Sequence, residues 1–205
     1  TPDYYGDIMP AISLIRDPII KLDIPPRDGL EHKDSWGTVY VWPQDSPGPH
    51  PRVTDENAVV KDIEKWHDCL KVPSLDNLDW SEAEEFAKNI DRSEKLAGFM
   101  FGAGLFERSH HLMGMENALI SYMEYPEEMS AMLREICEFK KKYIRLMAEH
   151  CHPEIIFYHD DWGTKQNLFL PPTVWREIIK PLQKEIADTI HECGMIYMHH
   201  ADCIC

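Results

Sequence analysis

Residues 154–163 read EIIFYHDDWG, and this stretch decides the fold class. The apolar residues after Glu154 predict a buried strand, and acids and a histidine follow it directly. Residues 195–203 read MIYMHHADC and repeat this plan with two histidines, an acid and a thiol. In parallel α/β folds the strands are covered on both faces, so sites are built where strands end. We therefore expect the functional residues at the ends of these two strands.

The sequence before and between these strands predicts crossover helices. Residues 96–101 predict another buried strand, and residues 105–122 predict a helix after it. A second helix begins at Pro126 and runs to about residue 150. A third runs from Pro172 to just before Gly194, with a kink expected at Pro181 because proline lacks an N–H donor. This alternation is typical of a parallel sheet with crossover helices.

The first 95 residues follow a different pattern. Residues 1–60 are rich in Pro, Asp and Gly, and they contain one predicted strand over residues 38–42. We therefore predict an irregular region over residues 1–95, with short helices and a strand, that packs on the α/β unit of residues 96–205. A (β/α)8 TIM barrel takes roughly 250 residues. We expect this chain to form part of such a barrel, with its later strands beyond Cys205.

Composition excludes several classes of partner. The chain has 205 residues and a formal net charge of −15, which argues against nucleic acid or an anionic membrane surface as a partner. No apolar run reaches about 18 residues, the length that spans a bilayer. Six cysteines without the spacing of a small disulfide scaffold indicate reduced thiols and a cytoplasmic location.

Several motifs together resemble the uroporphyrinogen decarboxylase superfamily. In chain order they are GFMFGAGLFE at 98–107, HDDWGT at 159–164, LFLPP at 168–172, WREIIKP at 175–181 and HECG at 191–194. The resemblance covers residues 96–205 and is weak before them. It implies a TIM barrel of the uroporphyrinogen decarboxylase type, and it does not specify the reaction.

The superfamily includes heme-pathway decarboxylases and cobamide-dependent methyltransferases. The methyltransferases carry a His-x-Cys pair at the end of the strand where His200 stands. By resemblance, zinc held there activates a thiol or similar methyl acceptor, and the methyl group passes to or from a corrinoid carried by a partner protein. The decarboxylases lack this pair and use an arginine-rich N-terminal motif, which residues 1–60 do not contain. A methyltransferase is our first hypothesis.

The candidate metal ligands are His200, Asp202 and Cys203. Zinc takes nitrogen, sulfur and oxygen ligands, and residues near a strand end can converge on one ion. The family pattern places a cysteine at position 202, where this chain has Asp202. Either a carboxylate replaces the thiolate or the register slips by one residue. The alternative is that these are loop residues that bind no metal.

Asp160 and Asp161 are the candidate catalytic residues. Adjacent residues after a strand point to opposite sides, so we expect at most one carboxylate to face the barrel centre. That carboxylate would act as a general acid or base, or hold a protonated group of the substrate. The alternative is a loop or helix-capping hydrogen bond to backbone N–H groups.

Four residues are candidates for substrate binding: Glu107, Tyr158, Trp162 and Gln166. Glu107 follows the predicted strand over residues 96–101, where it is either a further metal ligand or the acidic first turn of a helix. Tyr158 and Trp162 would belong to an apolar wall of the site, although aromatic residues at such spacing are more often core.

Two further hypotheses stay open at this point. The second is a metal-free uroporphyrinogen decarboxylase of porphyrin biosynthesis, in which Asp160 or Asp161 stabilises charge on a pyrrole nitrogen of a small-molecule substrate. The third is a truncated, catalytically silent binding subunit. An incomplete barrel exposes sheet edges that must be paired or covered, and a homodimer is one way to cover them.

Overall fold

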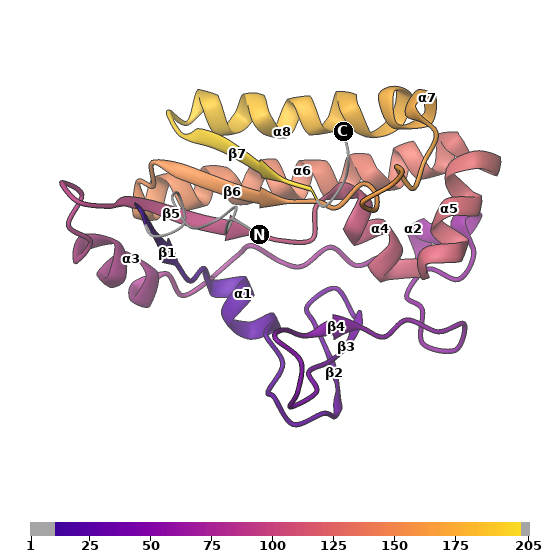
Figure 1. Cartoon of the computed structure of the whole chain (residues 1–205), viewed down its shortest axis with the longest axis horizontal. Coiled ribbons are helices and arrows are strands. Elements are labelled where there is room, and N and C mark those ends of the chain that lie inside the picture. The colour runs from indigo at the N-terminus through magenta and orange to yellow at the C-terminus, as the bar shows by residue number, and fades with distance from the viewer. Residues whose placement is uncertain (1–10, 202–205) are drawn as a thin grey trace.

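A computed structural model describes residues 11–201 and contains a four-stranded parallel sheet (Figure 1). Its strands are β1 (Ile12–Ile15), β5 (Leu96–Phe101), β6 (Ile155–His159) and β7 (Ile196–His200), in the order β1-β5-β6-β7. The predicted α/β class with a parallel sheet is confirmed. Within the described residues the sheet does not close into a barrel. Strand β1 comes from the region predicted to be mostly irregular, so the N-terminal segment contributes directly to the sheet.

The helices lie close to where the sequence predicts them. They are α4 (Leu105–Met113), α5 (Met115–Glu124), α6 (Pro126–Cys151), α7 (Pro172–Val174), the π-helix η3 (Trp175–Ile179) and α8 (Lys180–Glu192). The prediction of one helix over residues 105–122 was wrong. Gly114 has a φ of 83°, a left-handed conformation that glycine tolerates, and it separates α4 from α5.

The π-helix η3 lies just before Pro181, where the sequence predicts a kink. The N–H of Lys180 donates to the carbonyl of Trp175, which widens the turn just before the proline. Because Pro181 has no N–H, the ordinary i→i−4 bond to Glu177 is missing. A π-turn is one way in which a helix absorbs such a defect.

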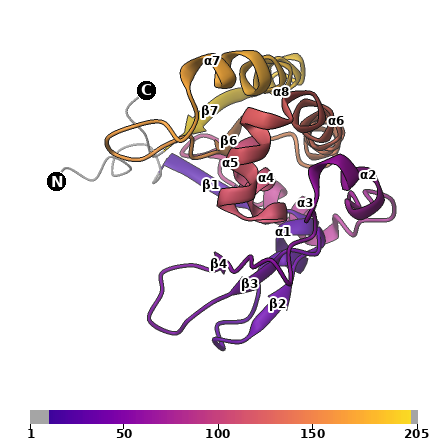
Figure 2. The same cartoon turned by 90° about the vertical axis from the view of Figure 1, so that its right-hand side faces the viewer.

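The N-terminal region surrounds a small antiparallel sheet with short helices. Its remaining elements are α1 (Pro18–Asp23), β2 (Glu31–Lys33), β3 (Val39–Val41), β4 (His50–Pro51), the 3₁₀ helix η2 (Ile63–Lys65), α2 (Trp66–Cys69) and α3 (Ser81–Lys88). Strands β2, β3 and β4 pair in that order and lie apart from the parallel sheet (Figure 2). The predicted strand over residues 38–42 corresponds to β3.

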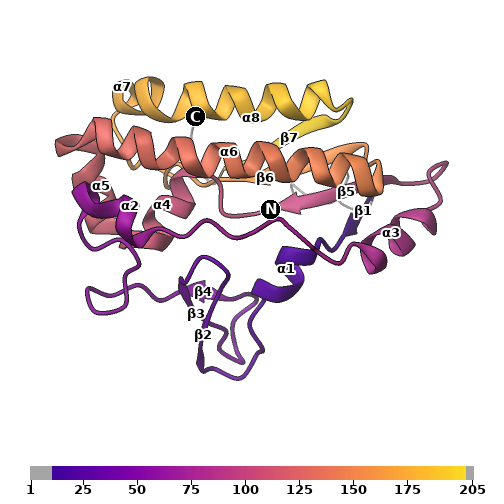
Figure 3. The same ribbon diagram turned by 180° about the vertical axis from the view of Figure 1, so that it is seen from behind.

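Helix α6 covers one face of the parallel sheet. It lies behind β5 and β6 in Figure 1 and in front of them in Figure 3. On that face the strands bury side chains such as Phe99, Ile156 and Tyr158. The opposite face keeps partly exposed residues, with Met100 at 38% and Ile196 at 54% exposure. The sheet therefore has a helix-covered face and an open face.

Two further properties bear on the sequence predictions. Among the described helices, none combines the length and apolar character that crossing a membrane requires. The four cysteines within residues 11–201 are free thiols: Cys69, Cys137, Cys151 and Cys193.

Candidate metal centre and the adjoining cavity

Strand register brings two histidines together on the open face of the sheet. Strands β6 and β7 run parallel, and His159 pairs directly with His200. Paired residues point to the same side of a sheet, so the two imidazoles are neighbours, with ring centroids 4.5 Å apart. Asp161 follows β6 by two residues. One ligand atom from each of these three residues lies within 4.8 Å of the others, a spacing that could hold a metal ion.

Glu107 fixes the orientation of His159. The Nδ1 atom of His159 lies 3.0 Å from Oε2 of Glu107, and its Nε2 lies 3.9 Å from Oδ2 of Asp161. Histidines that bind metals almost always have the second ring nitrogen held by a carboxylate or carbonyl. The pair Glu107–His159 has this arrangement, with Nε2 left to face Asp161 and His200.

Three carboxylates, those of Glu107, Asp160 and Asp161, act on the charge of His159. Burial lowers the pKa of its imidazole, but the hydrogen bond to Glu107 and the nearby carboxylates outweigh burial, and the pKa rises above its ordinary value. The same negative field favours a cation between His159 and Asp161.

The carboxylate of Asp160 is occupied by hydrogen bonds within the protein, in contrast to that of Asp161. It is fully buried and accepts hydrogen bonds from the backbone N–H groups of Phe106 (3.2 Å) and Glu107 (2.9 Å) at the start of α4. The indole N–H of Trp162 donates to the same carboxylate at 2.9 Å. Burial raises the pKa of Asp160 to about 6, although these hydrogen bonds lower it. Asp161 is therefore the acid of the pair that faces the histidines, and Asp160 occupies the capping position that the sequence left open.

Gly104 makes the approach of Asp160 to α4 possible. A Cβ atom on this glycine would lie 2.1 Å from Cγ of Asp160, a distance that real structures do not contain. The backbone N–H of Gly104 also donates to the carbonyl of His159 at 2.8 Å. Close packing of the residues 102–104 turn against the end of β6 places Glu107 within reach of His159.

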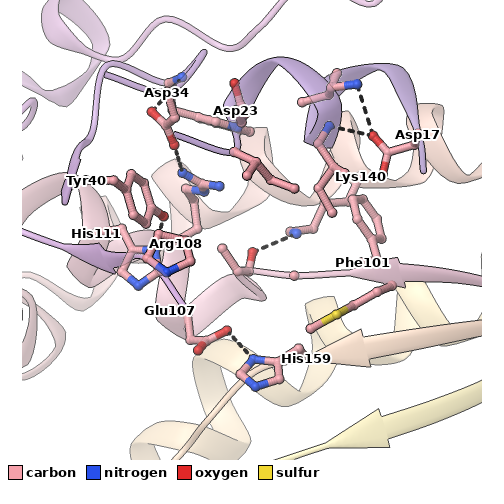
Figure 4. A pocket seen from close by; sticks show the side chains of 18 of the residues that line it. Asp17, Asp23, Asp34, Tyr40, Phe101, Glu107, Arg108, His111, Lys140 and His159 are labelled. Carbon is pink, nitrogen blue, oxygen red and sulfur yellow. Dashed lines mark hydrogen bonds and ion pairs between the residues drawn. The ribbon is translucent and has the colours of Figure 1, made fainter. Parts of the chain in front are cut away.

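A cavity of about 310 Å³ adjoins the metal cluster. Glu107 and His159 form part of its wall, and the rest comes from α1, β3, the end of β5, α4, α6 and adjoining loops (Figure 4). Cavities that bind small ligands usually have volumes of about 300 Å³ or more. The cavity thus lies between the N-terminal region and the carboxyl end of the parallel sheet.

Two partly buried polar contacts hold the N-terminal region against α4. Arg108 forms an ion pair with Asp34 at 2.8 Å, and its guanidinium stacks over the ring of Trp36 at 4.9 Å. The hydroxyl of Tyr40 lies 3.0 Å from Nδ1 of His111. Burial and neighbouring cations hold the pKa of His111 well below its ordinary value, which favours the neutral ring. These contacts close one side of the cavity.

The remaining sequence-predicted residues lie elsewhere. Tyr158 points to the helix-covered face and is fully buried. Trp162 lies outside the cavity, where its ring stacks on His199 at 4.3 Å. Gln166 is exposed in the loop after β6. Asp202 and Cys203 fall outside the described residues, so their predicted metal contact stays a prediction, whereas His200 lies in the cluster.

Sequence reasoning missed the N-terminal wall of the cavity and one residue of α6. Lys140 lies within the apolar stripe of that helix, four residues after Ile136 and seven before Met147. A charged residue at such a position is a signal of a buried cation. The cavity residues Asp17, Asp34 and Tyr40 gave no such signal, because their region has no regular periodicity.

Comparisons with known proteins add no assignment. No family model, no curated protein and no solved structure matches this chain.

Proposed function

We propose that this protein is a metal-dependent methyltransferase with its metal centre at His159, Asp161 and His200. The observation that carries the proposal is the convergence of two imidazoles and a carboxylate at the ends of β6 and β7. Three nitrogen and oxygen ligands are the usual protein contribution to a catalytic zinc site. The reaction is inferred from the resemblance to cobamide-dependent members of the uroporphyrinogen decarboxylase superfamily.

The sheet order supports the barrel that this resemblance implies. Strands β5, β6 and β7 are adjacent in chain order, and helices connect each to the next. Doubly wound sheets instead reverse direction at a switch point. We therefore propose that the four strands belong to a (β/α)8 barrel, with the metal centre at the carboxyl ends of the strands, where barrel enzymes place their active sites.

The donor atoms fit zinc. Zinc accepts imidazole nitrogen and carboxylate oxygen as ligands, and the hydrogen bond between His159 and Glu107 is the outer contact that zinc-binding histidines usually have. When bound, zinc lowers the pKa of a thiol ligand and so makes it nucleophilic at neutral pH. Iron(II) also takes two histidines and one carboxylate, so metal analysis must cover both ions.

The residues around the centre have separate tasks in this proposal. Glu107 orients the imidazole of His159, and Asp160 holds the start of α4, which carries Glu107. The cavity beside them receives the small methyl acceptor, a thiol or a tetrahydrofolate-type amine, and the corrinoid arrives on a partner protein. Asp160 does not face the cavity, and its two oxygens already accept three N–H groups. The tetrapyrrole decarboxylase hypothesis, which needs one of the two acids at the substrate, therefore depends on Asp161 alone.

Metal analysis combined with a methyl-transfer assay tests the proposal. We expect the purified protein to bind about one zinc or iron per chain and to transfer methyl from methylcobalamin to a small thiol. His200→Ala should lose the metal and the transfer activity, whereas His191→Ala, at an exposed position on α8, should keep both.

The two readouts separate the parts of the proposal. If the wild-type protein binds no metal, or if His200→Ala leaves binding unchanged, the metal centre is wrong. If metal binds at the three residues but no methyl group is transferred, the centre stands and the methyltransferase assignment falls.

A further inference from the structure

The side chain of Lys140 is buried without an acidic partner. It is 3% exposed, and its Nζ donates to the backbone carbonyl of Ala103 at 2.9 Å. Within residues 11–201 this carbonyl is the one hydrogen-bond acceptor of Nζ, and Asp160 and Glu107 act on the amine only through their charge. Buried lysines are normally paired, because an ammonium has three donors and a high desolvation cost. A neutral amine has two N–H donors instead of three and avoids the desolvation cost of the charge.

The surroundings of Lys140 are aromatic. Its Nζ lies 4.3 Å from the ring centre of Phe101 (Figure 4) and 5.2 Å from that of Tyr158. Both Phe101 and Lys140 line the 310 Å³ cavity. The amine therefore lies in the cavity wall among rings that give it little hydration.

The charged groups near Lys140 come from three elements. Helix α4 contributes Arg108, Glu107 and His111, the loop after β6 contributes Asp160, and Cys137 lies one turn earlier on α6. Burial lowers the pKa of Lys140 most, the charge of Arg108 lowers it further, and the two acids oppose both effects. The resulting pKa is about 7, so much of Lys140 is a free amine at neutral pH.

The acceptor of Lys140 has a strained backbone. Ala103 has a φ of 47°, in the left-handed region that residues with a Cβ rarely occupy. Strained residues of this kind cluster at functional sites, because the surrounding structure must hold them. Here the strained peptide directs its carbonyl to Nζ and so fixes the position of the amine in the cavity wall.

We propose that Lys140 is the nucleophilic amine of a carbonyl-binding site and forms an imine with a small aldehyde or ketone in the cavity. Lysines desolvated beside another cation are activated for this chemistry. The lone pair of Nζ attacks the carbonyl carbon, and the C=O electron pair moves to oxygen, which takes up a proton. Nitrogen gives up its two protons, oxygen takes up a second proton and leaves as water, and the nitrogen lone pair forms the C=N bond. One amine and one carbonyl give one imine and one water, and no oxidant or metal takes part.

Reductive trapping tests the proposal on the full chain. The protein is incubated at about pH 7.5 with propanal and cyanoborohydride, which reduces an imine to a stable propyl-amine, and peptide masses then locate the label. Lys141 is an internal control, because it is adjacent on the same helix. Its hydrogen bonds to Glu138 and Glu185 raise its pKa.

The expected result is a large difference between the two neighbours. At this pH an ordinary lysine is about 0.1% amine, whereas a lysine with a pKa of about 7 is mostly amine. Allowing for slower entry into the cavity, we expect Lys140 to be labelled at least about tenfold faster than Lys141. In concentrated urea the ratio should fall to about one, since it depends on the fold.

Lys140→Met should lose the fast label and retain the slow label on Lys141. If this variant does not fold, the ratio of Lys140 to Lys141 labelling in the unaltered chain is the test of the proposal. Equal labelling of the two lysines in the folded protein, or a ratio that persists in urea, would overturn the proposal. This test needs no bound metal, so its outcome is independent of the proposed methyl transfer.

Discussion

The metal cluster and the Lys140 cavity share the wall formed by Glu107 and His159, yet they are assembled differently. The cluster consists of the last residues of two adjacent strands and Asp161, two residues beyond the end of β6. The cavity draws its walls from segments more than a hundred residues apart, such as Asp17 and Lys140. The first depends on strand register, and the second depends on how the N-terminal region packs on α4 and α6. Substitutions confined to the cluster or to the cavity therefore test whether one can be altered without the other.

The largest effect is expected at the turn that joins the two regions. Gly104→Ala places a methyl group in the space of the Asp160 carboxyl, so either α4 or the end of β6 must move. We expect a loss of about 2–4 kcal/mol in the free energy of unfolding, measured by urea denaturation. Gly102→Ala is the matched control, because its added Cβ meets nothing within 4 Å. Similar losses in both variants would mean that Asp160 is not held as tightly as its contacts indicate.

The second effect is on the cavity and depends on pH. The pKa of Lys140 is about 7 in the folded chain and near its ordinary, higher value when unfolded. Between these values the unfolded state binds the extra proton, so stability rises with pH across this window. We expect the wild-type protein to gain about 2 kcal/mol relative to Lys140→Met between pH 7 and pH 9.

Urea denaturation at the two pH values measures this gain. Lys141→Met is the control for the charge change, because the pKa of Lys141 is raised and the side chain stays protonated across the window. Parallel stability profiles for the wild-type protein and Lys140→Met would contradict a buried, largely neutral lysine.

The smallest expected effect is on the metal cluster. Glu107→Gln keeps the shape of the side chain but removes the charge that orients His159. We expect zinc affinity to fall at least about tenfold, or about 1.4 kcal/mol, when measured by competition with a chelating dye. Glu116→Gln, at an exposed position on α5, should leave the affinity unchanged. An unchanged affinity in Glu107→Gln would remove this residue from the metal site.

The ends of β6 and β7 could be predicted because the residues that define them are neighbours in the sequence. The apolar runs before His159 and His200 predict strands, and two parallel neighbours bring their carboxyl ends to one edge. What the sequence could not supply was the register of β6 against β7. A shift of one residue would have turned His159 to the helix-covered face and Tyr158 to the open face. For the same reason, sequence alone could not decide which of Asp160 and Asp161 faces the histidines.

The sequence by itself determined the alternation of strands and helices and placed acids and histidines at the strand ends. The spacing of apolar residues and the positions of proline and glycine are properties of short segments. They can therefore be interpreted without knowledge of the fold. Only the tertiary structure decided that Glu107 holds His159, that Asp160 caps α4, and that Lys140 is buried beside Phe101. These are contacts between distant segments. Their geometry depends on the packing of whole layers, which no local pattern encodes.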